Sequence, residues 1–335
     1  MSESTGAAAV LPEGEGAPSG PETAQPRVIV LVNPSSGKGR AAKAAPIVVQ
    51  RFQQRGFDVV TVIGSDFIDA LARLRHSLDT GPTAAVVSVG GDGTVHLCLQ
   101  AVAGTDVPLG IIAGGTGNDN ATMHGSTSDA DRSATMLAEA LVRGRVRSID
   151  AGHAVSADGI SRWFLGVLSS GFDSMVNERA NRMSFPTGQS RYVAAILAEL
   201  RVFKAVPYVM VLDEGTPNEL REEKRGMLVA VGNGWQYGGG MKVCPGAKFD
   251  DGLLSVTFLD ELPTPTFLRV FPRVFKGTHV ERPEVHEHTA ASVRLDAPGQ
   301  IAYADGERIG PLPVEITIAP GAVRILVPKA EHVAT

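Results

Sequence analysis

The sequence predicts a two-part fold, in which an N-terminal α/β domain with a parallel sheet precedes a β-rich domain with antiparallel strands. From residue 27 to about residue 147, apolar runs alternate with helical segments, which is typical of a βαβ array. The second half instead consists of short alternating stretches between Gly, Pro and Asp turns. The length of 335 residues suits about two domains.

The N-terminal elements follow from the apolar runs and from the turns that end them. Val28–Val32 is apolar throughout, as in a parallel strand buried on both faces, and it ends in a turn at 33–37. The elements expected after this turn are a helix at 40–54, a strand at 58–63, a helix at 66–78, a strand at 84–89, a helix at 95–103 and a strand at 108–112.

In the second half we expect strands at 226–232, 253–259, 292–295, 314–318 and 323–327. Two helical insertions are expected, at 191–203 and 264–276. Residues 1–26 carry four prolines, four glycines, four glutamates and no basic residue. Such a segment buries too little apolar surface to offset its ordering entropy, and we expect a disordered tail.

Composition narrows the class of protein. Thirty-one basic and thirty-six acidic residues give a net charge of −5, which argues against a nucleic-acid partner. The chain has only two cysteines, Cys98 and Cys244, so it has no disulfide framework and suits a reducing compartment. The first ten residues lack the basic and apolar parts of a secretory signal, and no run of 18 apolar residues occurs. We therefore expect a cytoplasmic protein.

Three glycine-rich loops, at 33–39, 90–94 and 114–119, follow predicted strands of the first domain. Ligands of open α/β sheets lie beyond the carboxyl ends of the strands, so these loops should converge. Glycine lets main-chain N–H groups approach a phosphate, and the helix N-termini that follow favour negative charge. The loops predict a nucleotide site, and plain βα turns are the alternative.

Charged side chains accompany these loops. Lys38 and Arg40 lie beside the first loop and offer cationic contacts to a phosphate. Asp92 and Asp119 supply carboxylates that suit Mg²⁺ or ordered water. A Walker-type GxxxxGK[ST] loop is absent, and no strand leads into a clean GxGxxG followed by an acidic residue, so the dinucleotide fingerprint is not met.

The motifs Asn33–Gly37, Gly90–Thr94 and Gly115–Asp119 together resemble the catalytic domain of the diacylglycerol kinase family, specifically its soluble bacterial lipid kinases related to sphingosine kinases. GGDG alone is shared with NAD kinases and is similar to phosphofructokinase loops, whereas the other two loops make the resemblance specific. Three later segments, Gly171–Asp173, Pro245–Leu254 and Asp305–Glu307, are similar to later motifs of the family. The resemblance covers about residues 27–328.

The resemblance implies a first domain like those of phosphofructokinases and NAD kinases, and a second domain that is an antiparallel β-sandwich. It implies that the last strands return to the first domain, which would then comprise 27–148 and about 314–329, with the substrate domain at 149–313. It implies a metal site for Mg²⁺ made by the Asp251 carboxylate and the carbonyls of Lys248 and Leu253. The expected ATP-binding residues are Asn33, Pro34, Ser35, Ser36, Gly37, Lys38, Thr61, Gly90, Gly91, Asp92, Gly93, Thr94, Val95, His96, Gly115, Thr116, Asn118 and Asp119.

The resemblance places the catalytic base in Asp305–Glu307, where we choose Asp305 and keep Glu307 as the alternative. On the residues alone, this triplet is equally a hairpin turn, and Asp250–Gly252 is equally a turn before a strand. The chain departs from the family at His96-Leu97, where Asn-Glu is usual, and at Asn120, where an aromatic is usual.

The expected activity is transfer of the γ-phosphoryl group of ATP to a lipid hydroxyl, with diacylglycerol as the first choice. An NAD kinase and a non-catalytic nucleotide or lipid sensor are the alternatives. In 264–276, apolar residues recur with helical spacing beside Arg269, Arg273 and Lys276. This segment is either a core-facing helix with solvated arginines or a transient docking site on an anionic membrane. The oligomeric state, including a homodimer, stays open.

Overall fold

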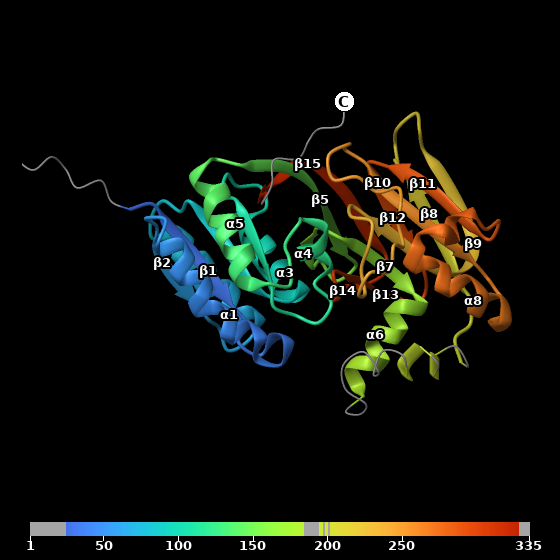
Figure 1. Ribbon diagram of the computed structural model, residues 1–335. Coiled ribbons are helices and arrows are strands. Elements are labelled where there is room, and N and C mark those ends of the chain that lie inside the picture. Colours follow the sequence, from blue (N-terminus) through green and yellow to red (C-terminus); the bar gives the residue numbers. More distant parts are fainter. Residues whose placement is uncertain (1–24, 184–193, 197, 200–201, 328–335) are drawn as a thin grey trace, which may run out of the picture.

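The computed structural model describes residues 25–183, 194–196, 198–199 and 202–327. Nearly all of the predicted tail and six of the thirteen residues of the predicted helix at 191–203 lie outside these residues, while 194–196 and 198–199 are helical. Within them, a parallel sheet with helices on both faces forms the N-terminal half, and antiparallel strands form most of the second half (Figure 1). No helix among the described residues has the length and apolar character needed to cross a membrane.

The N-terminal sheet has the parallel order β2-β1-β3-β4. Its strands are β1 (Arg27–Val32), β2 (Asp58–Val62), β3 (Ala85–Gly90) and β4 (Leu109–Ala113). Its helices are α1 (Ser36–Gln53), α2 (Phe67–Asp79), α3 (Asp92–Val102), α4 (Asp119–Met123) and α5 (Ala130–Val142). The expected alternation of strands and helices is confirmed.

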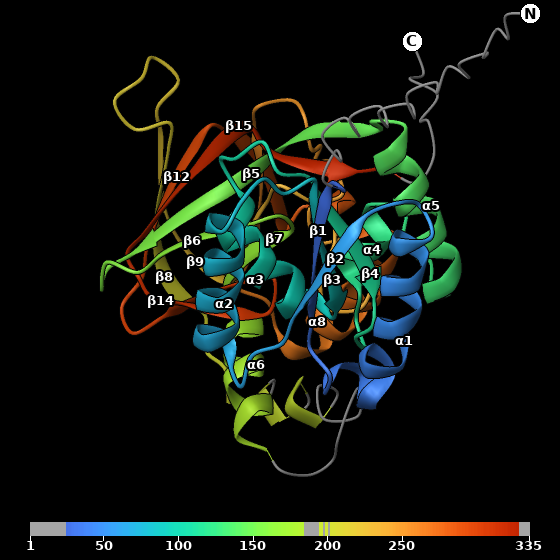
Figure 2. The same cartoon turned by 90° about the vertical axis from the view of Figure 1, so that its left-hand side faces the viewer.

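The apolar run in β1 serves two cores. Val28, Val30 and Val32 pack in the core that includes residues of α1 and α5. Ile29 and Leu31 point the other way and pack with α2 and α3. Successive side chains of a strand point to opposite faces, so a strand between two helical layers must be apolar at every position. Figure 2 shows these two helical layers with the strands between them.

The second half is built from antiparallel pairs. Its strands are β5 (Val146–Ser156), β6 (Ser161–Phe164), β7 (Val167–Gly171), β8 (Val206–Leu212), β9 (Leu220–Gly232), β10 (Leu254–Asp260), β11 (Val285–Ala290), β12 (Ser292–Asp296), β13 (Ile301–Ala304), β14 (Glu307–Pro311) and β15 (Val314–Leu326). The fold class predicted from the sequence, parallel strands followed by antiparallel strands, is confirmed.

Two long strands join the halves. β5 and β15 run antiparallel, with an irregularity between Ala319 and Val323. Beyond it, Ile325 of β15 pairs in parallel with Leu109 of β4. The last strand of the described chain therefore extends the N-terminal sheet, and one hydrogen-bonded sheet runs through both halves.

The helical segment predicted at 264–276 is present but changes type. It forms α8 (Thr264–Val270), followed by the 3₁₀ helix η1 (Phe271–Lys276) and the 3₁₀ helix η2 (Thr278–Glu281). The change occurs beside Pro272, which has no N–H to continue an α-helical ladder. With α6 (Phe172–Arg182), these elements cover one end of the second half (Figure 1).

Candidate active site

The three glycine loops meet at the carboxyl ends of the parallel strands. A Cβ atom at Gly91 would lie 3.2 Å from the Cα of Gly115, so these two loops are in contact through their backbones. The Arg40 guanidinium donates hydrogen bonds to the carbonyl oxygens of Gly37 and Gly115 and thereby joins the first loop to the third. A side chain at any of these glycines would separate the loops.

The first loop is shaped by its backbone. Asn33 Oδ1 accepts hydrogen bonds from the Ser35 N–H, at 3.2 Å, and from Ser35 Oγ, at 2.8 Å. Gly37, Lys38 and Gly39 follow with φ of +59°, +59° and +87°, in the left-handed region that favours glycine. Regular α1 therefore begins after Gly39, near the predicted start at residue 40.

The second loop is the first turn of a helix. α3 begins at Asp92 rather than at the predicted Val95, because Gly91 occupies the N-cap position. A helix N-terminus leaves main-chain N–H groups without helical partners, and these favour a phosphate. The side chains of Thr94, Val95 and His96 are buried in the structure and serve its interior.

Asp92 lies where the second and third loops meet. Its Oδ1 accepts a hydrogen bond from the Asn120 main-chain N–H, at 3.0 Å, and a longer one from Asn120 Nδ2, at 3.5 Å, which is what the family departure at residue 120 adds to the site. Burial raises the pKa of the Asp92 carboxyl, and the negative charges of Asp119 and Asp305 raise it further. A cation, or a protonated neighbour, would relieve this accumulation of negative charge.

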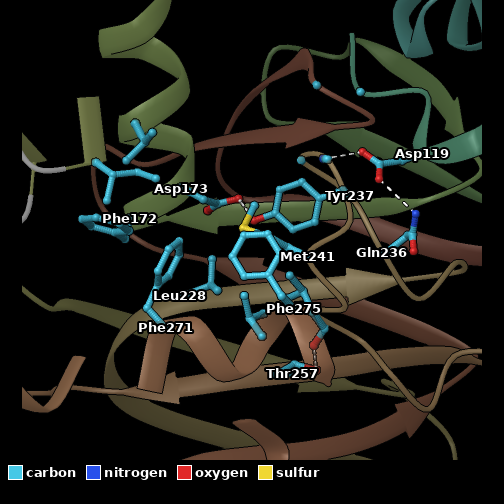
Figure 3. A pocket seen from close by; sticks show the side chains of 18 of the residues that line it. Asp119, Phe172, Asp173, Leu228, Gln236, Tyr237, Met241, Thr257, Phe271 and Phe275 are labelled. Atoms are coloured by element: carbon cyan, nitrogen blue, oxygen red, sulfur yellow. Dashed lines mark hydrogen bonds between the residues drawn. The ribbon is translucent and has the colours of Figure 1, made fainter. Parts of the chain in front are cut away.

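Asp119, expected to bind ATP or metal, accepts hydrogen bonds from residues in the second half of the chain. Its oxygens accept hydrogen bonds from Gln236 Nε2 at 3.0 Å, the Gly239 N–H at 2.7 Å and the Gly240 N–H at 2.8 Å (Figure 3). These donors satisfy both carboxylate oxygens. Asp119 therefore ties the third loop to the segment 236–240, it also lines the cavity, and its assignment to ATP or metal stays a prediction.

The predicted base triplet holds two carboxyl groups in different environments. Asp305 has φ of +53°, and its side chain is 2% exposed. Its Oδ2 accepts from the Leu165 N–H and its Oδ1 from the Gly166 N–H, each at 2.9 Å. His96 Nδ1 lies 3.8 Å from Asp305 Oδ2, and neither ring nitrogen of His96 has a hydrogen-bond partner among the described residues.

Glu307 lies over the second loop. A Cβ atom at Gly93 would be 2.5 Å from Glu307 Oε1, so the carboxylate would have to move if any other residue stood at position 93. Among the described residues, no hydrogen bond or ion pair engages the Glu307 side chain. Of the two acidic groups in the triplet, Glu307 is therefore the one with oxygens available to a ligand.

A cavity of about 790 Å³ begins at these loops and extends into the second half. Its polar end is lined by Asp92, Gly93, Thr116, Gly117, Asp119, Asn120, Asp305 and Glu307. Its apolar wall is formed by Phe172, Val176, Ile196, Leu228, Met241, Leu259, Phe267, Val270, Phe271, Val274, Phe275 and Val285. Figure 3 shows the aromatic and aliphatic side chains converging on this space.

One buried polar pair interrupts the apolar wall. Tyr237 Oη donates a hydrogen bond to Asp173 Oδ2 at 2.6 Å (Figure 3). Asp173 Oδ1 is buried and has no hydrogen-bond partner among the described residues. Burial raises the pKa of the Asp173 carboxyl and also raises the pKa of Tyr237 well above its usual value. Asp173 thus presents a hydrogen-bonding group to a ligand in the cavity.

The predicted metal loop lies elsewhere. Lys248, Asp251 and Leu253 are exposed, and none of them lines the cavity. Asp251 Oδ1 accepts a hydrogen bond from the Leu253 N–H at 3.1 Å. Across the described ranges, no group of three or more His, Cys, Asp or Glu side chains is placed to hold a metal ion. Oxygen donors suit a hard cation, and of the two carboxylates in this loop Asp250 pairs with Arg147 at 2.9 Å; the metal assignment to Asp251 stays a prediction.

Sequence reasoning located the loops but missed the groups that the second half supplies. The predicted residues Asp92, Gly93, Thr116, Asp119, Asp305 and Glu307 line one cavity. The other predicted residues of the three loops do not line this cavity, and Thr61 is exposed in β2 at the sheet edge. Gln236 and Tyr237 also line the cavity, and their place beside three consecutive glycines, at 238–240, is the signal in the sequence that could have identified them.

Comparisons with known proteins show which family the two halves of the chain resemble. The family model described as the diacylglycerol kinase catalytic domain matches residues 27–154, and that of the YegS C-terminal NAD kinase beta sandwich-like domain matches residues 166–327. A diacylglycerol kinase from Mycobacterium tuberculosis is 43% identical over 303 residues, covering 90% of this chain and 96% of the relative. One from Staphylococcus saprophyticus is 24% identical over 293 residues, covering 86% and 90%.

Among solved structures, that of a diacylglycerol kinase from Bacillus anthracis has a TM-score of 0.65 at 19% identity, covering 91% of this chain and 98% of that one. This likeness supports the fold. The sequence relatives and the matched domains place this protein in the class of lipid kinases. The chain belongs to the diacylglycerol kinase family, as the sequence motifs predicted, and membership of a kinase family implies the use of ATP.

Proposed function

We propose that this lipid kinase transfers the γ-phosphoryl group of ATP to the free hydroxyl of diacylglycerol and forms phosphatidic acid. The observation that carries the proposal is the single cavity that joins the glycine loops to an apolar wall. A phosphate donor and an acceptor with long apolar chains can occupy its two ends together. The reacting hydroxyl would then lie between Gly93 and the 305–307 turn.

The polar end suits phosphoryl transfer, in which the protein mainly positions the reactants and stabilises charge. The N-terminus of α3 and the glycine loops offer main-chain N–H groups to the phosphates. Mg²⁺ accompanying ATP would neutralise charge on the phosphate oxygens. Asp92 is the side chain that fits this ion, because its neighbouring carboxylates already favour a cation at this place.

Glu307 is our choice for the general base, in place of Asp305. A base must accept the hydroxyl proton directly, at about 2.6–3.2 Å. Both oxygens of Asp305 already accept main-chain N–H groups, whereas the Glu307 carboxylate projects over Gly93 without a partner among the described residues. Asp305 is then a positioning residue, which fixes the turn that carries Glu307 against the loop at 165–166.

The apolar wall favours a lipid over a nucleotide acceptor. Phosphorylation of NAD would require the cavity to surround a second nucleotide with charged phosphates, and a polar ligand loses its hydration where Phe, Val and Leu side chains line the wall. Acyl chains, by contrast, gain free energy on leaving water. The names of the relatives, diacylglycerol kinase in two cases, support the same choice.

The test is transfer of labelled phosphate from ATP to a panel of acceptors, separated by thin-layer chromatography. The panel contains diacylglycerol, monoacylglycerol, ceramide, a sphingoid base, phosphatidylglycerol and NAD. We expect labelled phosphatidic acid to form fastest. Faster labelling of another lipid would overturn the choice of acceptor and keep the lipid-kinase class, and labelling of NAD alone would overturn the assignment of the apolar wall to a lipid.

One further measurement distinguishes a kinase from a non-catalytic sensor. Titration calorimetry with ATP and Mg²⁺ reports nucleotide binding independently of turnover. Binding of ATP with no transfer to any acceptor, at the wild-type sequence and in the presence of detergent-dispersed lipid, would identify a sensor that kept the fold. We expect binding and transfer together, because the glycines of the loops and the Glu307 carboxylate are all in place.

A further inference from the structure

We propose that the outer face of α8 and η1 docks on an anionic phospholipid bilayer and holds the mouth of the cavity against it. This inference rests on the proposed function, because the bilayer is the source of the lipid. The 268–276 face, as we name it, consists of Leu268, Pro272 and Phe275 with Arg269, Arg273 and Lys276.

The segment is apolar on two sides, and only one of them faces the protein. Phe267, Val270 and Val274 are buried and line the cavity. Leu268 and Phe275 are 50% and 48% exposed, and Pro272 between them is exposed as well. Their spacing of four and three residues places them along one outward stripe. The helical spacing of apolar residues in the sequence included Phe275 of this outer stripe but not Leu268 or Pro272.

Cations accompany the exposed stripe. Arg269, Arg273 and Lys276 are exposed and make no ion pair with any residue that the structure describes. Basic residues in adjacent elements are paired, as in Arg225–Glu261 and Arg282–Glu284. A helix that presents exposed apolar residues beside unpaired cations is typical of an element lying at the surface of an anionic bilayer.

The cavity reaches the surface at the same place. Phe275 is half exposed, yet it lines the cavity together with Phe271 (Figure 3). A lipid entering beside these rings would keep its chains in contact with apolar groups on the way from the bilayer to the cavity. Contact of this face with the bilayer would therefore lower the cost of withdrawing a water-insoluble substrate.

The alternative occupant of this face is a second copy of the chain. In a two-fold symmetric dimer, the same patch faces itself, so the cations of one copy would oppose those of the other. Like charges brought together across an interface disfavour association. An anionic bilayer offers the opposite charge, and we commit to it as the partner.

The experiment measures cosedimentation of the full chain with vesicles of phosphatidylcholine, with and without phosphatidylglycerol, at low and high salt. The test variant is Arg269→Gln/Arg273→Gln/Lys276→Gln. Each cation near an anionic surface contributes about fivefold to binding, so the loss should be on the order of 100-fold. The remaining binding should depend less on salt. Leu268→Ser, which removes an exposed apolar group outside the cavity lining, should weaken binding severalfold.

The matched control is Lys43→Gln/Arg55→Gln/Arg132→Gln, which removes three exposed cations from the N-terminal half. It should bind vesicles like the wild type. Equal loss in both triple variants, or unchanged binding of the test variant, would overturn the proposal. Sedimentation velocity without vesicles adds a further criterion, because a wild-type dimer that Leu268→Ser converts to monomer would assign this face to self-association and overturn it too.

Activity measurements test the docking face and the proposed function separately. Short-chain diacylglycerol dispersed without vesicles needs no docking, so the test variant should phosphorylate it at the wild-type rate. A wild-type protein that binds anionic vesicles but phosphorylates no lipid would refute the proposed function and retain the docking face. Loss of activity on the dispersed substrate in the folded test variant would instead mean that these cations act in the cavity, against the docking role.

Discussion

The two ends of the cavity are made in different ways. The phosphate end consists mainly of backbone, because Gly37, Gly91 and Gly115 bring main-chain segments together where a side chain would not fit. The lipid end consists of side chains from α6, β9, β10, α8 and η1. A backbone-built site tolerates little change at its glycines, whereas a side-chain-built cavity can change its shape residue by residue. We therefore expect phosphate binding to tolerate few substitutions, and we expect acceptor preference to change with single substitutions in the cavity wall.

The largest effect should come from the group that links the two ends. Glu307→Gln preserves shape and removes the basicity of the carboxylate, so we expect kcat to fall by about 10²–10⁴ with ATP affinity nearly intact. Steady-state kinetics and calorimetry with ATP measure the two quantities. Unfolding stability should hardly change, since the Glu307 side chain has no partner among the described residues.

Asp305→Asn is the matched comparison for that variant. An asparagine offers only one oxygen to the two N–H groups of Leu165 and Gly166, which leaves one of these donors unpaired at a cost of about 1–3 kcal/mol. We therefore expect a loss of stability and a smaller loss of kcat. A larger loss of kcat for Asp305→Asn than for Glu307→Gln, measured on folded protein, would return the role of base to Asp305.

The second effect tests the rigidity of the phosphate end. Gly93→Val would place a β-branched side chain where Glu307 Oε1 now lies and where a phosphate would approach the backbone. We expect weaker ATP binding and a loss of kcat on the order of 10²-fold, because a small displacement of a reacting group is enough for such a loss. Gly104→Val controls for general strain, because a Cβ atom at this turn would meet no atom within 4 Å although φ is +76°. Equal activity of both variants would show that the phosphates bind elsewhere.

The third effect tests whether the lipid end is adjustable. Leu228 lines the cavity from β9 (Figure 3), and Leu228→Phe adds volume there. The efficiency for long-chain diacylglycerol should fall about tenfold, which is within the range for a change of one or two methylenes in an apolar pocket. Efficiency for short chains should hold. Leu228→Ala should shift the preference the opposite way, and a uniform change across chain lengths in both variants would contradict the assignment of the acyl chains to this wall.

The same contrast explains what could be predicted from the sequence. The glycine loops were predicted because each lies directly after a buried strand, so that local pattern and sheet geometry together determine their place. The predicted start of the first helix, at residue 40, is close to the observed start of regular α1, because this helix directly follows the first glycine loop. The cavity could not be predicted, because its wall combines residues from Phe172 to Val285 whose only local property is that they are apolar.

Hydrogen bonds between residues far apart in the chain are the other feature that could not be predicted from the sequence. Asp119 and Asp305 both sit in motifs that indicate a functional carboxylate, and nothing local indicates that their oxygens are occupied. Their partners, Gly239 and Leu165, are 120 and 140 residues away in the chain. Which carboxylate of a motif is free to act depends on the tertiary fold, and a resemblance to the family identifies the motif without choosing between its members.

The smallest effect concerns the contact between the two halves. The His124 ring, after α4, lies 4.7 Å from the Phe249 ring of the second half, and its Nε2 is buried without a partner among the described residues. Burial lowers the pKa of His124 to about 4; the Arg147 charge lowers it further and the Asp305 charge opposes this. The unfolded chain therefore binds a proton near pH 6.5 that the folded chain does not, and stability falls as the pH decreases from there toward 4.

Between pH 7 and pH 5 this difference in proton binding lowers the free energy of unfolding by about 1–2 kcal/mol. The figure is reduced for solvent screening, because His124 is partly exposed. Urea unfolding at both pH values should show that His124→Gln loses less stability on acidification than the wild type by this amount. Phe249 packs in the same core as Leu99 and Ile111 of the N-terminal half, so the two halves should unfold in one transition that carries the whole difference. An equal loss in both proteins would mean that His124 is already protonated at neutral pH or freely solvated. Two separate transitions would mean that the phosphate end and the lipid end are independent in stability as well as in construction.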